Sequence, residues 1–186
     1  MGGIRWVALL ALAVSALGQA DDGIAPEPPP RKERKPGDTI ALAVILHPKN
    51  PVTELSMAEL RSYFRMEKQF WPNKRRAVLY LRASDSLEYE ILLDKVYKIS
   101  HEKLQKFWVR QLFSGEIPAK PSYVPSADAA GSRVHAGEGA VSVVLADEIP
   151  KGVRVLKIDG KKPTDEGYPL KGVVKPPEPS EDADAS

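Results

Sequence analysis

The sequence predicts one α/β domain in which a mixed or mostly parallel sheet is flanked by helices. The apolar runs at residues 40–46 and 140–145 do not alternate with polar residues, as is typical of strands covered on both faces. Between them lie stretches with helical apolar spacing, several of which follow a serine that can cap a helix. Strands that alternate with helices favour the α/β class.

Proline marks the expected limits of this domain. The 17 prolines of the 186-residue chain crowd residues 26–36 and 163–179. Proline and charge keep a chain extended and solvated, so we expect a linker at 21–37 and a disordered tail at 161–186. The folded domain is expected at 38–160, a length that supports one core.

The amino terminus has the pattern of a secretory signal peptide. Arg5 precedes an apolar run of about a dozen residues, and small residues follow at Gly18 and Ala20. The run is too short for a typical membrane span. We therefore expect cleavage after Ala20 and a periplasmic or secreted protein that is not transmembrane, with an uncleaved amino-terminal anchor as the alternative.

The first half of the domain reads as strand, turn and helix. Residues 40–46 predict a central strand, and the two prolines of HPKNPVTEL interrupt the chain after it. Ser56 and Glu59 have the spacing of a capping box before a short helix. Its expected apolar face consists of Met57, Leu60 and Phe64.

A second strand, at 77–81, precedes the polar turn RASDS and a helix over 87–97. The expected apolar face of this helix comprises Leu87, Ile91, Leu92 and Val96, and its expected solvent face comprises Glu88, Glu90, Asp94, Lys95 and Lys98.

Ser100 is expected to cap a third helix with a core stripe of Leu104, Phe107, Trp108 and Leu112. Ser126 then starts a short helix, 140–145 form a strand, and 153–158 form the last strand. Phe70, Trp71 and Trp108 are interpreted as core residues, with stacking on a sugar or base as the alternative.

Several chemistries lack the residues that they require. There is no Cys, so disulfides, thiolate metal sites and cysteine nucleophiles are excluded. His47, His101 and His135 lack the spacing of a metal site, and neither a Gly-x-Ser-x-Gly turn nor a nucleotide-binding glycine loop occurs. We expect no metal, no cofactor and no catalytic activity.

Charge is distributed unevenly along the chain. Residues 31–120 hold 18 basic and 11 acidic side chains, whereas 121–186 hold 8 and 11. Such asymmetry is typical of attraction to an anionic ligand, polymer or lipid surface, but a mixed solvated surface gives the same counts. Because export removes the chain from nucleic acid, no nucleic-acid partner is expected.

Four segments in order resemble the phosphate-type periplasmic substrate-binding proteins. They are IALAVILHPKNPVTELS, AELRSYFRMEKQFWPNKR, VLYLRASDS and EGAVSVVLADEIPKGVRVL. The resemblance covers roughly residues 40–158 and implies a single lobe of the type II periplasmic-binding-protein-like fold. It also implies an exported, non-catalytic protein that binds phosphate or another small oxyanion, in association with an ABC-type transporter or another envelope protein.

The resemblance implies a ligand loop at residues 82–86, which we call the elbow. Arg82 would make a charge-assisted contact to the oxyanion, and Ser84 and Ser86 would donate hydroxyl hydrogen bonds. Asp85 would accept a proton from a protonated ligand oxygen. The family's loop is Gly-Ser-Gly-Thr, so the elbow lacks the glycines that allow close backbone approach.

Asn50, Thr53 and Ser56 follow the first predicted strand, and ligands of open α/β sheets bind at the carboxyl ends of strands. These three residues are therefore further candidates. Arg133 on the predicted helix behind Ser126 is a weaker one.

Two alternatives stay open. Asp85 or Ser86 could simply cap the following helix. The domain also has room for only one of the two lobes that close around a ligand, so the second lobe comes from another copy or protein, or the chain is an envelope interaction module that has lost small-ligand binding.

Overall fold

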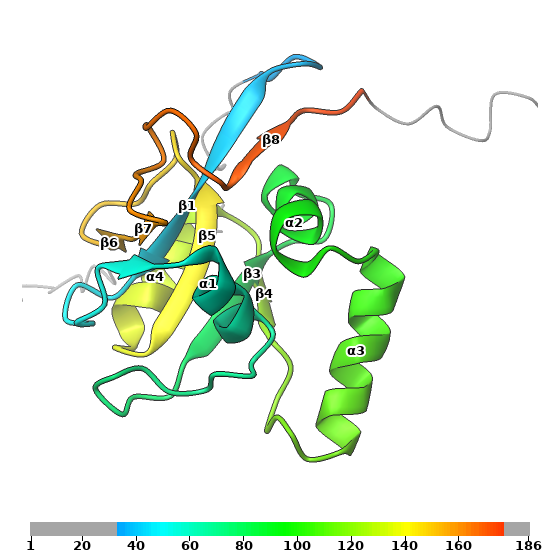
Figure 1. The fold of residues 1–186 in the computed structure, drawn as a ribbon, viewed down its shortest axis with the longest axis vertical. Coiled ribbons are helices and arrows are strands. Elements are labelled where there is room, and N and C mark those ends of the chain that lie inside the picture. Colours follow the sequence, from blue (N-terminus) through cyan, green and yellow to red (C-terminus); the bar gives the residue numbers. More distant parts are fainter. Residues whose placement is uncertain (1–32, 177–186) are drawn as a thin grey trace, which may run out of the picture. The chain divides into compact units, whose positions relative to one another are not determined.

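The computed structural model describes residues 33–176, which form a mixed β-sheet with helices packed against it (Figure 1). Its strand order is β4-β3-β5-β1-β6, and β8 pairs with β1 outside this path. The strands are β1 (Thr39–Leu46), β3 (Val78–Arg82), β4 (Ser122–Val124), β5 (Ala140–Leu145), β6 (Arg154–Val155) and β8 (Lys171–Val173). A second small sheet pairs β2 (Glu54–Leu55) with β7 (Lys157–Ile158). The predicted α/β class is confirmed.

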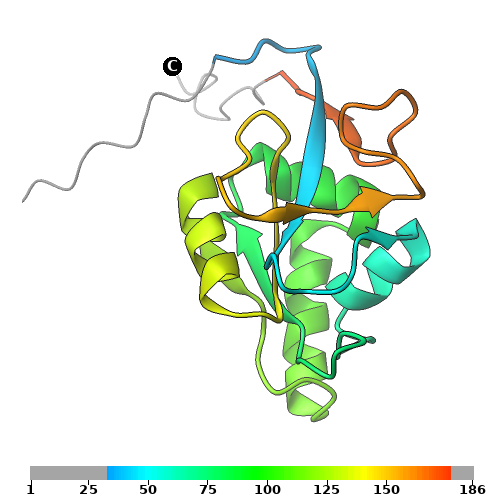
Figure 2. The same cartoon turned by 90° about the vertical axis from the view of Figure 1, so that its left-hand side faces the viewer.

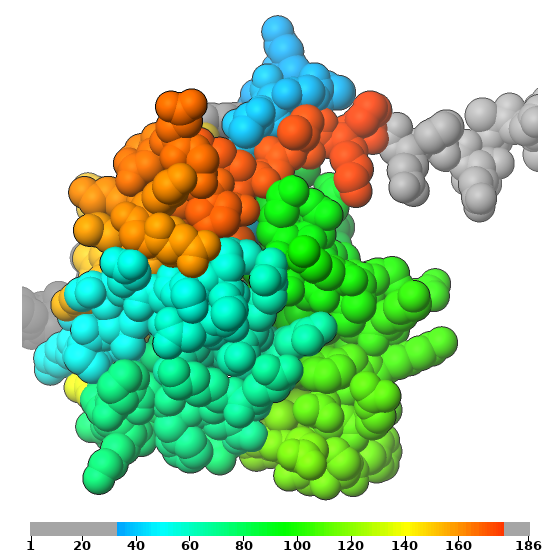
Figure 3. All heavy atoms as spheres, viewed as in Figure 1, coloured from blue at the N-terminus to red at the C-terminus, as the bar shows by residue number. Residues whose placement is uncertain are grey.

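Helices cover both faces of the main sheet (Figures 1 and 2). On one face pack α1 (Met57–Phe64), α2 (Leu87–Leu92), its π-helical continuation η1 (Leu93–Tyr97) and α3 (His101–Phe113). On the other face packs α4 (Ala127–Ala136). Side chains fill the spaces between the ribbons, and the surfaces of α1 and the α2–α3 region meet directly (Figure 3).

The apolar sequence of β1 follows from this three-layer arrangement. Leu42, Val44 and Leu46 belong to the larger core under α1, α2 and α3. Ala43 and Ile45 belong to the smaller core under α4. Successive side chains of a strand point to opposite faces, so a strand buried on both sides must be apolar at every position.

The strands of the sheet do not all run the same way. β3 is parallel to β4 and to β5, whereas β1 is antiparallel to β5. β1 therefore runs opposite to β3, and the carboxyl ends of these two strands lie at opposite edges of the sheet.

Serine starts all four α-helices of the described chain. The side-chain oxygens of Ser56, Ser86, Ser100 and Ser126 accept hydrogen bonds from backbone N–H groups three residues ahead. Each bond satisfies one of the donors that a helix start leaves unpaired. At the start of α1 the Glu59 carboxylate accepts hydrogen bonds from the backbone N–H and the hydroxyl of Ser56. These two bonds lower the pKa of Glu59.

The expected domain limits need correction at both ends. Residues 161–176, expected in a disordered tail, are placed against the domain: β8 pairs with β1, and Tyr168 and Leu170 are buried. At the other end Arg34, expected in the linker, forms ion pairs with Asp147 and Glu148, both 2.9 Å long. The predicted signal peptide, most of the linker and residues 177–186 lie outside the described part.

Four smaller expectations are also wrong. The predicted strand at 153–158 is two short strands in different sheets, because β6 pairs with β1 and β7 with β2. Glu88, expected in solvent, is 3% exposed, and Leu112, expected in the core, is 38% exposed. Trp71 and Trp108 are buried as predicted, whereas Phe70 is 51% exposed.

Candidate functional site

Arg82, the charged residue of the elbow, is used inside the fold. It is 3% exposed at the end of β3, and its Nε donates to Oε1 of Glu88 over 2.8 Å. Its Nη1 donates to the carbonyl of Val124 at the end of β4, over 3.0 Å. The guanidinium therefore ties two strand ends to the first turn of α2, and a carboxylate already occupies the position opposite its charge.

The serines of the elbow divide between interior and surface. Ser86 is 6% exposed, and its Oγ accepts from the N–H of Tyr89 over 3.2 Å. Ser84 and Asp85 are exposed to solvent. The capping alternative thus describes the observed role of Ser86, and a cap removes a donor that an anion would need.

The second predicted group, which follows β1, also has structural roles. Asn50 is fully buried; its Oδ1 accepts from the N–H of Val52 over 3.1 Å, and its Nδ2 donates to the carbonyl of Glu138 over 3.3 Å. Ser56 caps α1, and Thr53 is exposed. Asn50 therefore stabilises a turn against the segment that enters β5.

The structure does not bring the two predicted groups together. Asn50, Thr53 and Ser56 follow the carboxyl end of β1, and the elbow follows the carboxyl end of β3. Since these strands are antiparallel, the groups lie at opposite edges of the sheet. The sequence does not determine strand direction, so this separation could not be predicted from it. Arg133, the weaker candidate, is exposed on α4, on the face of the sheet away from α1 and α3.

A pocket between α1 and α3 has the electrostatics that the elbow lacks. Its volume is about 480 Å³, and it is lined by Arg65, Ile99, Lys103, Lys106, Phe107 and Arg110. Four of these six residues are cationic, and none is acidic. We call it the basic pocket.

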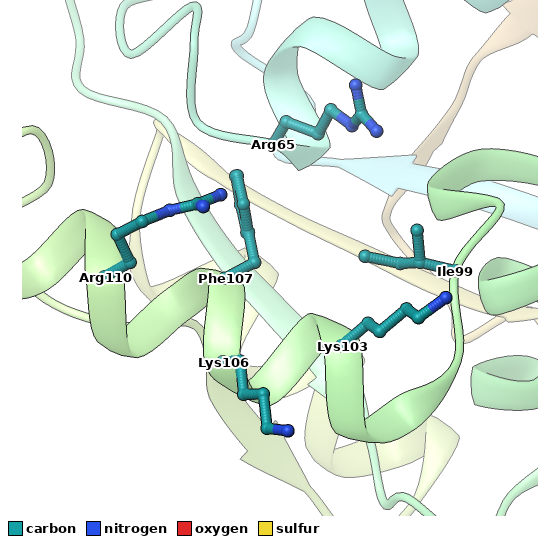
Figure 4. A pocket seen from close by; sticks show the side chains of 6 residues that line it. All are labelled: Arg65, Ile99, Lys103, Lys106, Phe107 and Arg110. Atoms are coloured by element: carbon teal, nitrogen blue, oxygen red, sulfur yellow. The ribbon is translucent and has the colours of Figure 1, made fainter.

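The basic side chains of the pocket come from two elements, α1 and α3 (Figure 4). Arg65 ends α1, and the Arg110 side chain extends beside Phe107. Lys103 extends beside Ile99, whereas Lys106 points away from the other labelled side chains. The pocket therefore combines four cationic side chains with the apolar side chains of Ile99 and Phe107.

These cations are available to an external partner. Among residues 33–176, the Lys103, Lys106 and Arg110 side chains form no ion pair or hydrogen bond. Among the same residues, the ion pairs of Arg65 are limited to one, in which its Nη1 lies 3.9 Å from Oε1 of Glu67. Like charges held near one another without a counter-charge raise the local potential and attract anions.

Helix geometry explains why α3 presents this surface. Leu104 and Trp108, one turn apart, are buried in the larger core, where the Trp108 ring contacts Tyr97 of η1. Lys103, Lys106 and Arg110 keep helical spacing on a neighbouring stripe that faces away from the core. The spacing of these three residues is visible in the sequence. Tertiary packing brings Arg65 close to them, so the basic pocket could not be predicted from the sequence.

A second exposed stripe on α3 is apolar. Val109, Leu112 and Phe113 are 43%, 38% and 87% exposed. Tyr123 on β4 is 44% exposed, and its hydroxyl accepts a hydrogen bond from Nε2 of Gln105 on α3. One helix thus presents a charged stripe and an apolar stripe to solvent.

Buried tyrosines lie behind the elbow and under α1. Burial raises the pKa of Tyr89, whose hydroxyl lies 2.9 Å from Nδ1 of His101. Burial also raises the pKa of Tyr97, whose hydroxyl donates to the carbonyl of Phe64 over 3.0 Å. The raised pKa values mean that both hydroxyls stay protonated to more alkaline pH than an exposed tyrosine does.

Among the described residues, 33–176, no three His, Asp or Glu side chains are grouped to hold a metal ion. Over the same residues no helix combines the length and apolarity needed to cross a membrane.

No protein-family model matches the chain, and no curated protein matches its sequence. Solved structures match its fold. An ABC-type phosphate transport receptor from Vibrio cholerae has a TM-score of 0.59 at 15% identity, over 74% of this chain and 55% of the receptor. PstS from Borrelia burgdorferi has a TM-score of 0.59 at 18% identity, over 75% and 57%. A phosphate-binding protein from Stenotrophomonas maltophilia has a TM-score of 0.50 at 17% identity, over 69% and 41%.

The chain therefore spans about half the length of the solved structures that it matches. The resemblance noted in the sequence is confirmed at the level of the fold: the described residues have the architecture of part of a phosphate-type receptor.

Proposed function

We propose that this chain is an exported, non-catalytic protein that binds a small oxyanion such as phosphate, with the basic pocket as its binding site. The observation that carries the proposal is the group of four cationic residues around one cavity without a lining carboxylate. Arginine binds an oxyanion through two parallel hydrogen bonds, and lysine adds positive charge. The phosphate receptors with the same fold support the choice of anion.

The elbow is the competing location, and its charges argue against it. Its arginine already faces Glu88, and Asp85 adds a second carboxylate at the surface. An incoming anion would have to displace the Glu88 carboxylate from Arg82 and would also approach the negative charge of Asp85. The basic pocket requires neither step, and its open position fits weak, reversible binding by a single lobe.

Isothermal titration with orthophosphate and sulfate tests the proposal. The paired variant Lys103→Ala/Arg110→Ala should abolish the heat, because it removes two cations of the pocket. Ser84→Ala, an exposed change in the elbow, is the matched control and should leave the heat unchanged. Loss of heat in the control with retention in the pocket variant would place the ligand at the elbow, and no heat from the unmodified chain at millimolar ligand would refute anion binding.

A second candidate function is an envelope interaction module. The exposed stripe of Val109, Leu112 and Phe113 favours it, because contiguous exposed apolar residues are typical of contact surfaces. A pull-down from an envelope extract should recover a stoichiometric partner that Phe113→Ser releases. Recovery that is unaffected by Phe113→Ser would remove the stripe from consideration.

A further inference from the structure

The basic pocket continues into a second cavity. That cavity has a volume of about 800 Å³ and shares Ile99 and Lys103 with the basic pocket. It adds Arg61 from α1, together with Lys95 and Lys98 from the segment that joins α2 to α3. We call the two cavities together the basic groove; its cationic residues include Arg61, Arg65, Lys98, Lys103, Lys106 and Arg110.

The carboxylates of the second cavity are already neutralised. Glu90 forms an ion pair with Lys175, whose Nζ lies 2.7 Å from Oε1 of Glu90. Asp94 forms one with Lys95, whose Nζ lies 2.8 Å from Oδ2 of Asp94. Lys98 forms no side-chain ion pair with any residue of 33–176. The acids of this cavity therefore do not cancel the positive charge of the groove.

The Arg61 side chain connects α1 to the segment that joins α2 to α3. Its Nη2 donates to the carbonyl of Lys95 over 3.2 Å, but its Nε is buried and has no hydrogen-bond partner within the described chain. The hydrogen bond to Lys95 holds the Arg61 charge in place at the second cavity.

The groove is longer than a single oxyanion. Lys103 and Arg110 are seven residues apart on one helix, about 10 Å along its axis. Arg61 and Lys98 extend the positive surface beyond Lys103 into the second cavity. One orthophosphate could contact only two or three of these cations, whereas a chain with a charge on every unit could contact all of them.

We propose that the basic groove binds a linear chain of linked phosphate groups along its length. This inference rests on the proposed function for its first contact, which is the basic pocket, and adds the second cavity as the seat of later units. Arg65 and Arg110 suit phosphate oxygens, since guanidinium donates two parallel hydrogen bonds to them, and Arg61 adds positive charge in the second cavity. Each neutralised phosphate also releases counterions, so affinity should grow with chain length.

A chain-length series tests the inference. Orthophosphate, tripolyphosphate and long-chain polyphosphate are titrated into the full chain at several salt concentrations. The dissociation constant should fall at each step, and its dependence on salt should become steeper for longer chains. Equal affinity for all three, counted per molecule, would overturn the inference while leaving the proposed function intact.

Variants locate the added contacts. Lys98 has a left-handed backbone, with φ of 54°, so Lys98→Asn removes the charge while keeping a residue that tolerates this conformation. Long-chain affinity should fall about threefold to fivefold, the scale of one exposed ion pair, with no change for orthophosphate. Lys74, with φ of 63° and a position outside both cavities, provides the matched control Lys74→Asn, which should change neither.

The outcomes separate the two proposals. If long-chain binding is insensitive to Lys98→Asn, the assignment to the groove is overturned. If polyaspartate of the same charge binds equally well, the preference for phosphate is overturned. Binding only to vesicles of phosphatidylglycerol would overturn it as well, since the ligand would then be a lipid surface. Long-chain binding without orthophosphate binding would support the groove and refute the small-oxyanion function.

Discussion

The elbow and the basic groove both contain arginine, but the fold uses the two regions differently. In the elbow Arg82 is 3% exposed, faces a carboxylate at 2.8 Å and holds a strand end in place. In the groove Lys103, Lys106 and Arg110 face solvent and have no counter-charge among residues 33–176. The comparison shows that a charge at the place where the resemblance predicts a ligand loop can become part of the structure, while the charges without a partner among residues 33–176 lie elsewhere.

The largest expected effect comes from breaking the elbow ion pair. Arg82→Met leaves the buried Glu88 carboxylate without its partner and should lower the free energy of unfolding by about 3–5 kcal/mol. Urea denaturation followed by circular dichroism measures the change. The double variant Arg82→Met/Glu88→Leu should recover most of the loss, because no buried charge remains unpaired. A double variant as unstable as the single one would contradict this role.

Substitutions on the buried face of α3 should lower stability much more than substitutions on its groove face. Trp108→Ala removes a side chain that is 1% exposed, and the resulting cavity should cost about 3 kcal/mol or more. Arg110→Ala, on the groove face two residues later, should change stability by no more than about 0.5 kcal/mol. Thermal unfolding of both variants provides the comparison. An unchanged melting temperature for Trp108→Ala would refute its place in the core.

Ser86 gives a smaller effect that sharpens its assignment as a cap. Ser86→Ala removes the acceptor for the N–H of Tyr89 and should cost about 1 kcal/mol. Ser86→Asp, which restores an acceptor, should recover the stability. If Ser86→Ala instead left stability unchanged and weakened phosphate binding, the elbow would be a ligand loop.

Alkaline pH should lower the free energy of unfolding because of the buried Tyr168. Burial raises the pKa of Tyr168, and the buried hydroxyl has no hydrogen-bond partner among the described residues. Its stabilising effect is complete below the unfolded pKa of about 10 and is lost as pH rises above it, because the unfolded chain then releases a proton that the folded chain keeps. Tyr168→Phe should therefore reduce the loss of stability at pH 10.5 by about 0.8 kcal/mol. An identical pH profile in both proteins would contradict the burial of this group.

Local features of the fold could be predicted from the sequence. The strand at 40–46 lacks alternation because both of its faces are buried, and Ser56 with Glu59 forms the expected capping box. These features depend on neighbours along the chain. The ordered segment around β8 could not be predicted, because its proline and charge are typical of a tail while its pairing with β1 is long-range.

The site was less predictable for the same physical reason. Glu88 has the position of a solvent-facing helix residue, and only the approach of Arg82 explains its burial. Asn50 and the elbow each follow a strand, but the antiparallel direction of β1 separates them. The spacing of Lys103, Lys106 and Arg110 was available in the sequence, whereas the approach of Arg61 and Arg65 from α1 depends on packing.

The central claim is that the anion binds at the groove and not at the elbow. Backbone amide chemical shifts of the full chain, recorded while orthophosphate is added, test it most directly. The largest shifts should occur at Arg65 and at residues 99–110, with Ser84 to Leu87 unchanged. Saturable shifts confined to Ser84–Leu87 would contradict the claim.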